Sequence, residues 1–326
     1  LTKTGEGILR MGQVGVYSTP TTISGGTLRM TSSAPMTPIA GATVWLDASI
    51  LAIGDGEAVT YLTDRSGNGH DAVPSYSTFL PTFNASELNG RGTIHIDGGV
   101  EGLRTLDSLG IDGDTDRTLF AVVAKANATD GEMYINIGDA SANYHAFGFD
   151  LKQNTTYVPY VFGMGGVETA ARPNGQYQLL CGMRESESGV NSGYLNGAYV
   201  GSASSCLYGD DSPLEIGYIS GFDSSSHGDF AEVLVYDWAL TDAERRTVEA
   251  YLNYKWFGIE PSGPILSPAS PVAIAASAAL DLNGFSQNIG PLSGAGRVML
   301  DGGTLTVNST VNSMFTGTLS GNGGLT

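Results

Sequence analysis

The chain has 326 residues, of which 41% are hydrophobic, so it holds enough apolar material for a buried core. Its 33 acidic and 15 basic residues give a formal net charge of −18. A surface of that sign repels nucleic-acid phosphates and anionic lipids, which excludes nucleic acid as an expected partner. The longest apolar run, around residues 272–280, is shorter than the roughly 18 residues of a membrane span, so we expect none in this sequence.

The two ends of the chain carry a short repeat. The sequence GILRM at residues 7–11 recurs as GTLRM at residues 26–30, and the unit GTL returns at residues 303–305 and 317–319. Short apolar strands separated by glycine-rich corners at a regular interval are typical of a stacked β-solenoid. A flexible Gly/Ser linker is the alternative, but it would lack the recurring leucines. We therefore expect solenoid segments at residues 1–37 and 272–326, lying side by side.

Between residues 38 and 260 the sequence changes to short apolar runs bounded by turn residues, which predict strands. The runs are residues 44–47, 59–62, 93–97, 118–124, 133–137, 145–151, 157–162, 177–184, 214–217 and 230–236. Asn196-Gly197 predicts a type I′ hairpin turn, because both residues accept positive φ. So many strands predict a two-sheet β-sandwich.

One helix is expected, beginning after Leu240. Thr241 and Glu244 have the spacing of a capping box, and Val248, Leu252 and Trp256 then recur on one apolar face. That face must dock on the sandwich. Prolines at positions 261, 264, 268 and 271 predict an extended connector over residues 261–271.

These segments resemble two known families. Residues 1–7, Tyr17 and residues 21–29 are similar to the passenger-associated repeat of bacterial autotransporters, and residues 280–296 and 315–325 to the rungs that precede it. The middle block resembles concanavalin-A-like, laminin-G-type domains. The matching motifs are VWLDAS at 44–49, DRSGNGHDA at 64–72, LNGR at 88–91, IHIDG at 94–98 and AEVLVYDWALT at 231–241.

The resemblance implies an all-β protein: a concanavalin-A-like jelly-roll sandwich with one C-terminal amphipathic helix, between flanking β-solenoid rungs. It also implies an extracellular location, secreted or on a bacterial cell surface. The chain is then expected to continue into further repeats of a longer parent protein.

A loop near residue 64 has the composition of half a calcium site. Asp64, Ser66, Asn68 and Asp71 supply side-chain oxygens around a glycine, which makes Ca²⁺ the candidate cofactor. The twelfth position holds Ser75 instead of glutamate, so the loop is no EF-hand. The same residue types also build purely structural loops by bonding their own backbone, and both interpretations stay open.

Glu232 is the acidic residue to consider for catalysis, because regular alternation places it on one strand face with Phe230, Leu234 and Tyr236. A glycosidase needs two carboxylates across the bond, as the Glu-x-Asp-x-x-Glu strand of laminarinase-like enzymes provides. No such strand exists here, and alternation points Asp229 to the opposite face. We therefore expect no catalytic residues and a structural hydrogen-bonding role for Glu232.

Three tyrosines are candidate ligand-binding residues. Tyr144, Tyr157 and Tyr160 lie in neighbouring strand segments, where exposed rings can stack on sugars, although tyrosines of an all-β domain also pack across the sheet. Cys181 and Cys206 form either one disulfide or two small core positions. The four histidines, at positions 70, 95, 145 and 227, have no metal-binding spacing.

The sequence thus favours a non-catalytic extracellular binding or adhesion module, with glycans or other surface polymers as the expected ligand class. Two alternatives stay open. One is a glycan-active enzyme on the same fold, and the other is a structural spacer within a fibre, because fold alone does not assign function.

Overall fold

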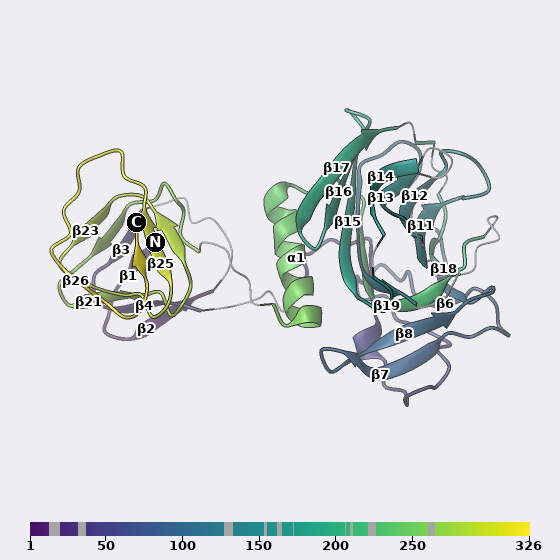
Figure 1. Ribbon diagram of the computed structural model, residues 1–326, viewed down its shortest axis with the longest axis horizontal. Coiled ribbons are helices and arrows are strands. Elements are labelled where there is room, and N and C mark those ends of the chain that lie inside the picture. The colour runs from purple at the N-terminus through teal and green to yellow at the C-terminus, as the bar shows by residue number, and fades with distance from the viewer. Residues whose placement is uncertain are drawn as a thin grey trace. The chain divides into compact units, whose positions relative to one another are not determined.

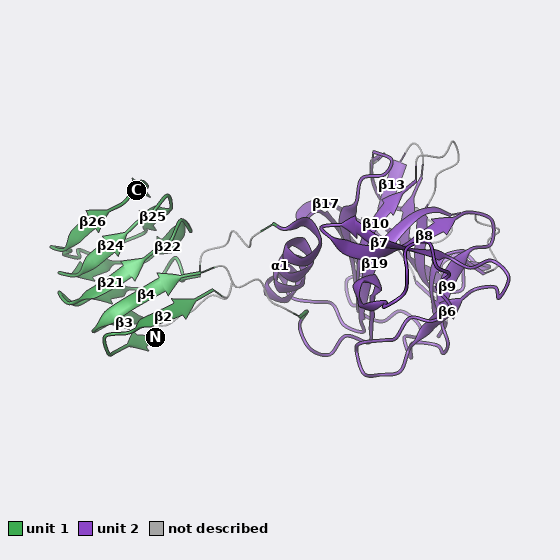
Figure 2. Ribbon diagram, turned by 90° about the horizontal axis from the view of Figure 1, so that it is seen from below, with its two compact units in different colours: residues 1–38, 259–326 green, residues 39–258 purple. Residues whose placement is uncertain are grey.

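The computed structural model describes residues 1–12, 20–31, 37–126, 133–152, 155–161, 165–171, 173–205, 207–208, 211–220, 226–259 and 265–326. The chain divides into two compact units (Figures 1 and 2). Unit 1 comprises Leu1–Pro38 with Ile259–Thr326, and unit 2 comprises Ile39–Gly258. The described part of the chain holds no helix long enough and apolar enough to cross a bilayer.

Unit 1 is a β-solenoid whose short strands stack into parallel sheets. The first sheet runs β1 (Thr2–Lys3), β3 (Thr21–Ile23), β20 (Val272–Ile274), β23 (Leu292–Gly294). The second runs β2 (Ile8–Met11), β4 (Gly26–Met30), β21 (Ala278–Asp281), β24 (Arg297–Met299), β26 (Thr318–Ser320). The third runs β22 (Gln287–Ile289), β25 (Thr304–Val307), β27 (Gly324–Leu325).

The two terminal segments of the chain form one continuous stack. Strand β3 pairs directly with β20, with Thr22 opposite Ala273, and β4 pairs with β21, with Leu28 opposite Leu280. Unit 2 is therefore inserted between two adjacent rungs, whose pairing continues across the insertion. Part of the expected proline connector also belongs to the solenoid, since Ile265 and Leu266 are buried in its core.

One apolar ladder runs through the solenoid. Leu9, Leu28, Leu280, Val298 and Leu319 lie opposite one another in successive rungs. The three inner members are fully buried, whereas Leu9 is 37% exposed and Leu319 is 40% exposed. Each rung covers the apolar side chain of its neighbour, which is how a solenoid builds a core from units too small to fold alone.

Unit 2 contains two antiparallel sheets. The eight-stranded sheet runs β17 (Ala198–Ser204), β16 (Val190–Leu195), β15 (Gln178–Glu185), β10 (Arg117–Lys125), β19 (His227–Tyr236), β8 (Arg91–Asp97), β7 (Thr82–Leu88), with β5 (Val44–Asp47) also on β19. The seven-stranded sheet runs β14 (Gly165–Ala170), β13 (Thr155–Val161), β12 (Ala146–Leu151), β11 (Met133–Gly138), β18 (Leu214–Gly217), β9 (Gly102–Thr105), β6 (Ala72–Pro74).

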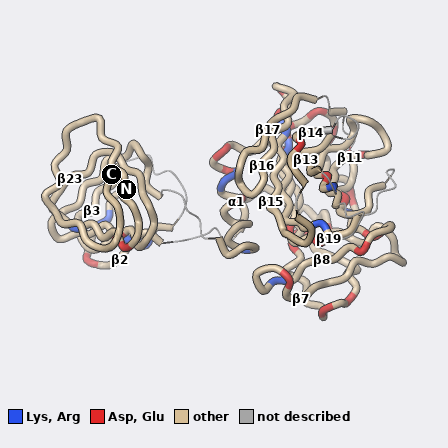
Figure 3. The backbone as a smooth tube through the Cα atoms, viewed as in Figure 1, with Lys and Arg blue, Asp and Glu red and all other residues tan. Residues whose placement is uncertain are grey.

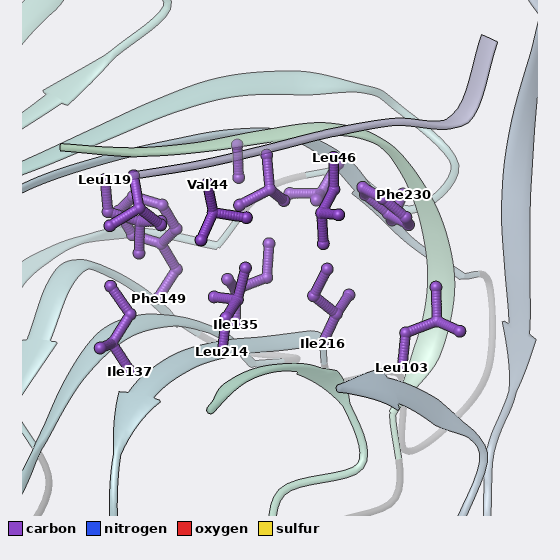
Figure 4. Packing of buried hydrophobic residues seen from close by; sticks show 14 of the residues in the cluster. Val44, Leu46, Leu103, Leu119, Ile135, Ile137, Phe149, Leu214, Ile216 and Phe230 are labelled. Atoms are coloured by element: carbon purple, nitrogen blue, oxygen red, sulfur yellow. The ribbon is translucent and has the colours of Figure 1, made fainter. Parts of the chain in front are cut away.

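The main core lies between these two sheets. Figure 4 shows Leu119, Val44, Leu46 and Phe230 of the eight-stranded sheet facing Ile137, Ile135, Leu214, Ile216 and Leu103 of the seven-stranded sheet. Strand β10 is buried along its whole length, as its continuous apolar sequence predicts for a central strand.

The outer face of the eight-stranded sheet is covered by α1 (Asp242–Phe257). Both hydrogen bonds of the predicted capping box between Thr241 and Glu244 are present, and Gly258 ends the helix in the left-handed conformation. Val248, Leu252 and Trp256 pack on the sheet in a second hydrophobic cluster. A short 3₁₀ helix, η1 (Ala48–Ile50), follows β5. The all-β class with a C-terminal helix is confirmed.

Some local predictions need correction. Residues 59–62 form no strand, only an isolated bridge from Leu62 to Ala72. Val59 and Leu62 anchor a loop to the core, and such a loop has the same apolar pattern as a short strand. Strands β6, β7, β9 and β14 were not predicted from the sequence. Strand β7 is largely exposed and β14 begins with two glycines, so both lack the apolar alternation of a strand. The hairpin turn has positive φ at Asn196 and Gly197, as predicted.

The ladder gives a test of the solenoid core. Leu280→Ala leaves a cavity among buried neighbours and is expected to lower the stability of unit 1 by about 2–5 kcal/mol. Leu319→Ala, in the same ladder but 40% exposed, should cost much less. Urea unfolding followed by circular dichroism would show the change. The three tryptophans all lie in unit 2, so a shift of the tryptophan-fluorescence transition in Leu280→Ala would contradict this assignment.

Candidate functional site

Glu232 lies beneath α1 and has no exposed surface. Its Oε1 accepts hydrogen bonds from Trp45 Nε1 at 2.5 Å and the Tyr251 hydroxyl at 2.7 Å. Its Oε2 accepts from Lys255 Nζ at 2.7 Å and Trp256 Nε1 at 2.5 Å. The carboxylate therefore joins β19 to β5 and to the last turns of α1, and its lone pairs are used by protein donors.

A second carboxylate completes this buried network. Lys255 Nζ also lies 2.7 Å from Asp47, which forms a further ion pair with Arg65. Burial alone would raise the pKa of Asp47, but the charge and hydrogen bond of Lys255, together with Ser49 and Arg65, outweigh burial and lower it. Burial and the nearby charge of Asp47 raise the pKa of Glu232. Lys255 thus bridges two buried carboxylates and offsets part of the desolvation of each.

The sequence prediction of which strand face each residue occupies is wrong for two neighbours of Glu232, namely Phe230 and Asp229. A β-bulge in β19 puts Glu232 opposite Val122 and Phe230 opposite Val123, with Ala231 as the extra residue. Phe230 therefore points into the core between the sheets, away from Leu234 and Tyr236. Asp229 shares the outer face with Glu232, because the inserted residue reverses the alternation that separates them in a regular strand.

Sharing a face does not make the two carboxylates a catalytic pair. Asp229 accepts a hydrogen bond from Asn84 and lies 2.9 Å from His95 Nδ1, at the end of the sheet formed by β7 and β8. Glu232 is sealed under the helix with its oxygens engaged. A substrate has no access to Glu232, so its chemistry is that of a structural acceptor.

Glu232→Gln tests this role. Removing the charge leaves Lys255 and two indole donors facing an amide, and breaking a buried ion pair is expected to cost about 3–5 kcal/mol. Asp237→Asn, just after the same strand at an exposed position, should change stability little and is the matched control. Tryptophan-fluorescence unfolding of unit 2 measures both. A Gln variant as stable as the wild type would contradict the network.

The expected calcium residues form a compact loop whose oxygens bind the protein itself. Asp64 Oδ1 accepts from the backbone N–H groups of Trp45 and Ser66, and Oδ2 accepts from Ser66 Oγ at 2.6 Å and from His70 N at 3.0 Å. Asn68 Nδ2 donates to the carbonyls of Ala42 and Thr43.

Asp71 completes the same loop. Its Oδ1 accepts from the backbone N–H of Asp64 at 2.7 Å, and its Oδ2 accepts from the Tyr61 hydroxyl. Across the described ranges, no three histidine, cysteine or acidic side chains gather in the arrangement of a metal site. These hydrogen bonds agree with the structural interpretation of the loop, in which Asx and Ser side chains bond to nearby backbone groups.

We therefore expect calcium to leave the stability of unit 2 unchanged. A cation would have to displace the backbone and hydroxyl donors that now occupy Asp64, so it would gain little free energy. Melting curves followed by tryptophan fluorescence, in millimolar Ca²⁺ and in excess EGTA, give the measurement. A melting temperature that rises with Ca²⁺ and returns with EGTA would restore the calcium interpretation.

The outer face of the seven-stranded sheet offers a different kind of site. Its polar residues line up in two rows across adjacent strands, because paired residues of antiparallel strands share a face. One row is Tyr134, Asp150, Tyr157 and Glu168, and the other is Arg104, Glu215, Asn136, Gly148 and Tyr160. The inner faces of the same strands carry the core residues.

A small pocket, about the size of one water molecule, lies on this face. It is lined by Tyr134, Asn136, Ala140, Phe149, Asp150, Tyr160 and Ile219. Gly148 lies between Asn136 and Tyr160 in its row, and a Cβ there would lie 1.9 Å from the Ile135 carbonyl oxygen, so the close approach of β11 requires glycine. A glycine within a strand often marks a place where another group approaches the backbone closely. Ala140 and Ile219 pack on Tyr134 in a small cluster that walls one side.

Two of the three predicted tyrosines meet beside this pocket. The rings of Tyr157 and Tyr160 are 5.3 Å apart, and Lys152 Nζ lies 5.8 Å from each. Lys152 also forms a 2.9 Å ion pair with Asp150. Glu215, in the same row as Asn136, accepts from Ser220 N and Oγ, and burial raises its pKa. The half-buried side chains of Tyr157, Tyr160 and Lys152 thus lie beside the buried polar groups of this face.

Tyr144 does not join them. It lies in the loop after β11 and packs edge-on against Tyr208, with ring centroids 6.1 Å apart. Sequence reasoning also missed Asn136, Asp150 and Glu215, which line or adjoin the pocket face. Alternation within β11 and β12 already places Asn136 and Asp150 opposite the core residues, but their shared pocket depends on strand order, which the sequence does not state.

The cysteines and histidines complete the predicted residues. Cys181 is buried under α1 and carries a free thiol, and Cys206 lies outside the described residues. His95 pairs with Asp229, whose hydrogen bond raises the histidine pKa. His145 lies 6.1 Å from the Tyr208 ring, and His227 is opposite Asp97 on β8.

No family model matches the chain, and no curated protein matches its sequence. Solved structures that are similar to this chain include domain 4 of AbnA, a GH43 extracellular arabinanase from Geobacillus stearothermophilus, in complex with arabinotriose. That match has 16% identity, covers 65% of this chain and 98% of the arabinanase domain, and has a TM-score of 0.45.

Two further structures are similar to the same extent. An arabinofuranosidase complexed with arabinofuranosyl-alpha-1,2-xylobiose has 12% identity, with 71% of this chain and 62% of that chain covered, at a TM-score of 0.49. Trypanosoma rangeli sialidase has 14% identity, with 69% of this chain and 34% of the sialidase covered, at a TM-score of 0.46. At these identities and scores the matches assign neither a family nor an activity.

Proposed function

We propose that unit 2 is a non-catalytic glycan-binding module carried on an extracellular β-solenoid. The observation that carries the proposal is the outer face of the seven-stranded sheet, where the half-buried rings of Tyr157 and Tyr160 lie side by side with Lys152 near both. A sugar presents an apolar ring face and a rim of hydroxyls. Partly exposed aromatic rings with a charged hydrogen-bond donor beside them are complementary to both.

The proposal includes the finer fold and the setting. Unit 2 is then a concanavalin-A-like jelly-roll sandwich of the laminin-G type, and unit 1 a segment of autotransporter-style repeat with further rungs in the parent protein. Support comes from the motifs at residues 44–49 and 231–241. They form β5 and β19 and supply Trp45, Asp47 and Glu232 to the buried network under α1.

The charges around the pocket support binding over hydrolysis. Asp150 is paired with Lys152, and Glu215 is held by Ser220, so each carboxylate of this face has a protein partner. A glycosidase needs one free nucleophile or base and one free acid facing the same bond. Figure 3 shows acidic and basic residues dispersed along the backbone of unit 2, with both signs present on α1.

A glycan-active enzyme is the second candidate, since Asp150 and Glu215 lie on one face and burial raises the pKa of Glu215 as a general acid requires. One measurement distinguishes glycan hydrolysis from glycan binding. Release of reducing sugar from a polysaccharide by the wild-type protein, lost in Asp150→Asn at unchanged melting temperature, would replace the binding proposal with hydrolysis.

Tyr160→Ala tests the binding site. Loss of the Tyr160 ring is expected to weaken the binding of any glycan found on an array by about 2- to 10-fold, because one aromatic contact is removed. Tyr199→Ala is the matched control, because Tyr199 is an exposed tyrosine with an edge-on ring partner on the eight-stranded sheet. Isothermal titration measures both. Equal affinities for wild type and Tyr160→Ala would remove the pocket from the proposal.

A further inference from the structure

The loop between β11 and β12 holds Tyr144 in an unusual backbone conformation. Among the described residues, the non-glycine positions with positive φ are Asn89, Tyr144, Asn196, Asn283 and Asp301. Asparagine and aspartate adopt the left-handed region readily, because their short polar side chains bond locally. An aromatic residue does so rarely, and Tyr144 has φ +70°. Such outliers concentrate at ligand sites, where the surrounding structure holds them in place.

Neighbouring groups fix this loop. The backbone N–H of Tyr208 donates to the carbonyl of Tyr144 at 2.7 Å, and the two rings pack edge-on. Earlier in the loop, Ser141 N donates to Asp139 Oδ1 at 2.7 Å. Leu207, next to Tyr208, is buried in the core between the sheets. Tyr208 itself nevertheless leaves 59% of its surface exposed. A positioned ring with an open face is what a stacking ligand requires.

The same loop connects this aromatic pair to the pocket. Ala140 lines the pocket, and Tyr144 follows it before β12 begins at Ala146. Gly148, which pairs with Asn136 of the pocket lining, is separated from Tyr144 by at most about 13 Å of extended chain. That upper limit is within the reach of a short oligosaccharide.

We propose that Tyr144 and Tyr208 form a second aromatic subsite that extends the pocket, so that the ligand is a linear oligosaccharide instead of a single sugar. This inference rests on the glycan-binding function proposed above. One sugar unit stacks on the half-buried Tyr160 ring, and a later unit of the same chain stacks on Tyr208. Tyr144 acts as a positioning residue, because its left-handed backbone and its ring hold Tyr208 in place.

The experiment compares ligands of increasing length. The probes are neutral linear oligosaccharides of one to six units, derived from xylan, arabinan, glucan and mannan, first on an array and then by isothermal titration. The wild type is expected to bind the longer members of one series more tightly than the monosaccharide. Tyr208→Ala should weaken binding of the longest member by about 3- to 10-fold and leave the shortest bound member unchanged.

Two controls separate the possible failures. Tyr199→Ala removes a ring that is also 59% exposed and edge-on to a neighbour, so it should leave every affinity unchanged. Tyr160→Ala should weaken short and long probes alike. Tryptophan-fluorescence melting confirms that each variant is folded.

The outcomes are distinct. Affinity that is independent of chain length, or unchanged in Tyr208→Ala while Tyr160→Ala loses binding, overturns the second subsite and leaves the proposed function intact. An equal loss in Tyr199→Ala also overturns the second subsite, since it assigns the effect to exposed tyrosines in general. If no probe of any length binds the wild type, both the proposed function and this inference fail.

Discussion

The fold of unit 2 depends on a buried carboxylate beneath its helix. Glu232 accepts hydrogen bonds from Trp45, Tyr251, Lys255 and Trp256, so one side chain fixes the contacts among β19, β5 and α1. A charge at this depth is stable only because Lys255 and the indole donors replace water. Removing one partner would leave the others buried without compensation, so the network specifies one docking of the helix.

The bulge in β19 makes that network possible. Without the extra residue at Ala231, alternation would place Phe230 and Glu232 on the same face. With it, Phe230 fills the core between the sheets while Glu232 faces the helix. The same shift brings Asp229 to the helix side, where it pairs with His95. The one inserted residue therefore places Phe230 in the core and places Glu232 and Asp229 on the helix side, where they form hydrogen bonds.

The two faces of unit 2 are used in different ways. On the eight-stranded sheet, aromatic and charged groups are covered by α1 and satisfied within the protein. On the seven-stranded sheet, Asn136 and Asp150 are also buried, whereas the rings of Tyr157 and Tyr160 beside them are half-buried. The partial exposure of these rings distinguishes the candidate binding site from the structural network under the helix. The solenoid of unit 1 carries this module as an insertion, because its rungs pair across the gap in sequence.

The sequence by itself determined the features that depend on nearby residues. Repeated leucines predicted the solenoid, the Thr241 and Glu244 spacing predicted the helix start, and Asn196-Gly197 predicted a hairpin. Tertiary structure decided the rest. The bulge at Ala231 moved Phe230 and Asp229 to unexpected faces, since an extra residue is visible only in pairing with β10. The grouping of Asn136, Asp150 and Tyr160, and the separation of Tyr144 from them, follow from strand order. Local sequence patterns determine the conformation of a segment. The other segments that it packs against are determined by the packing free energy of the whole chain.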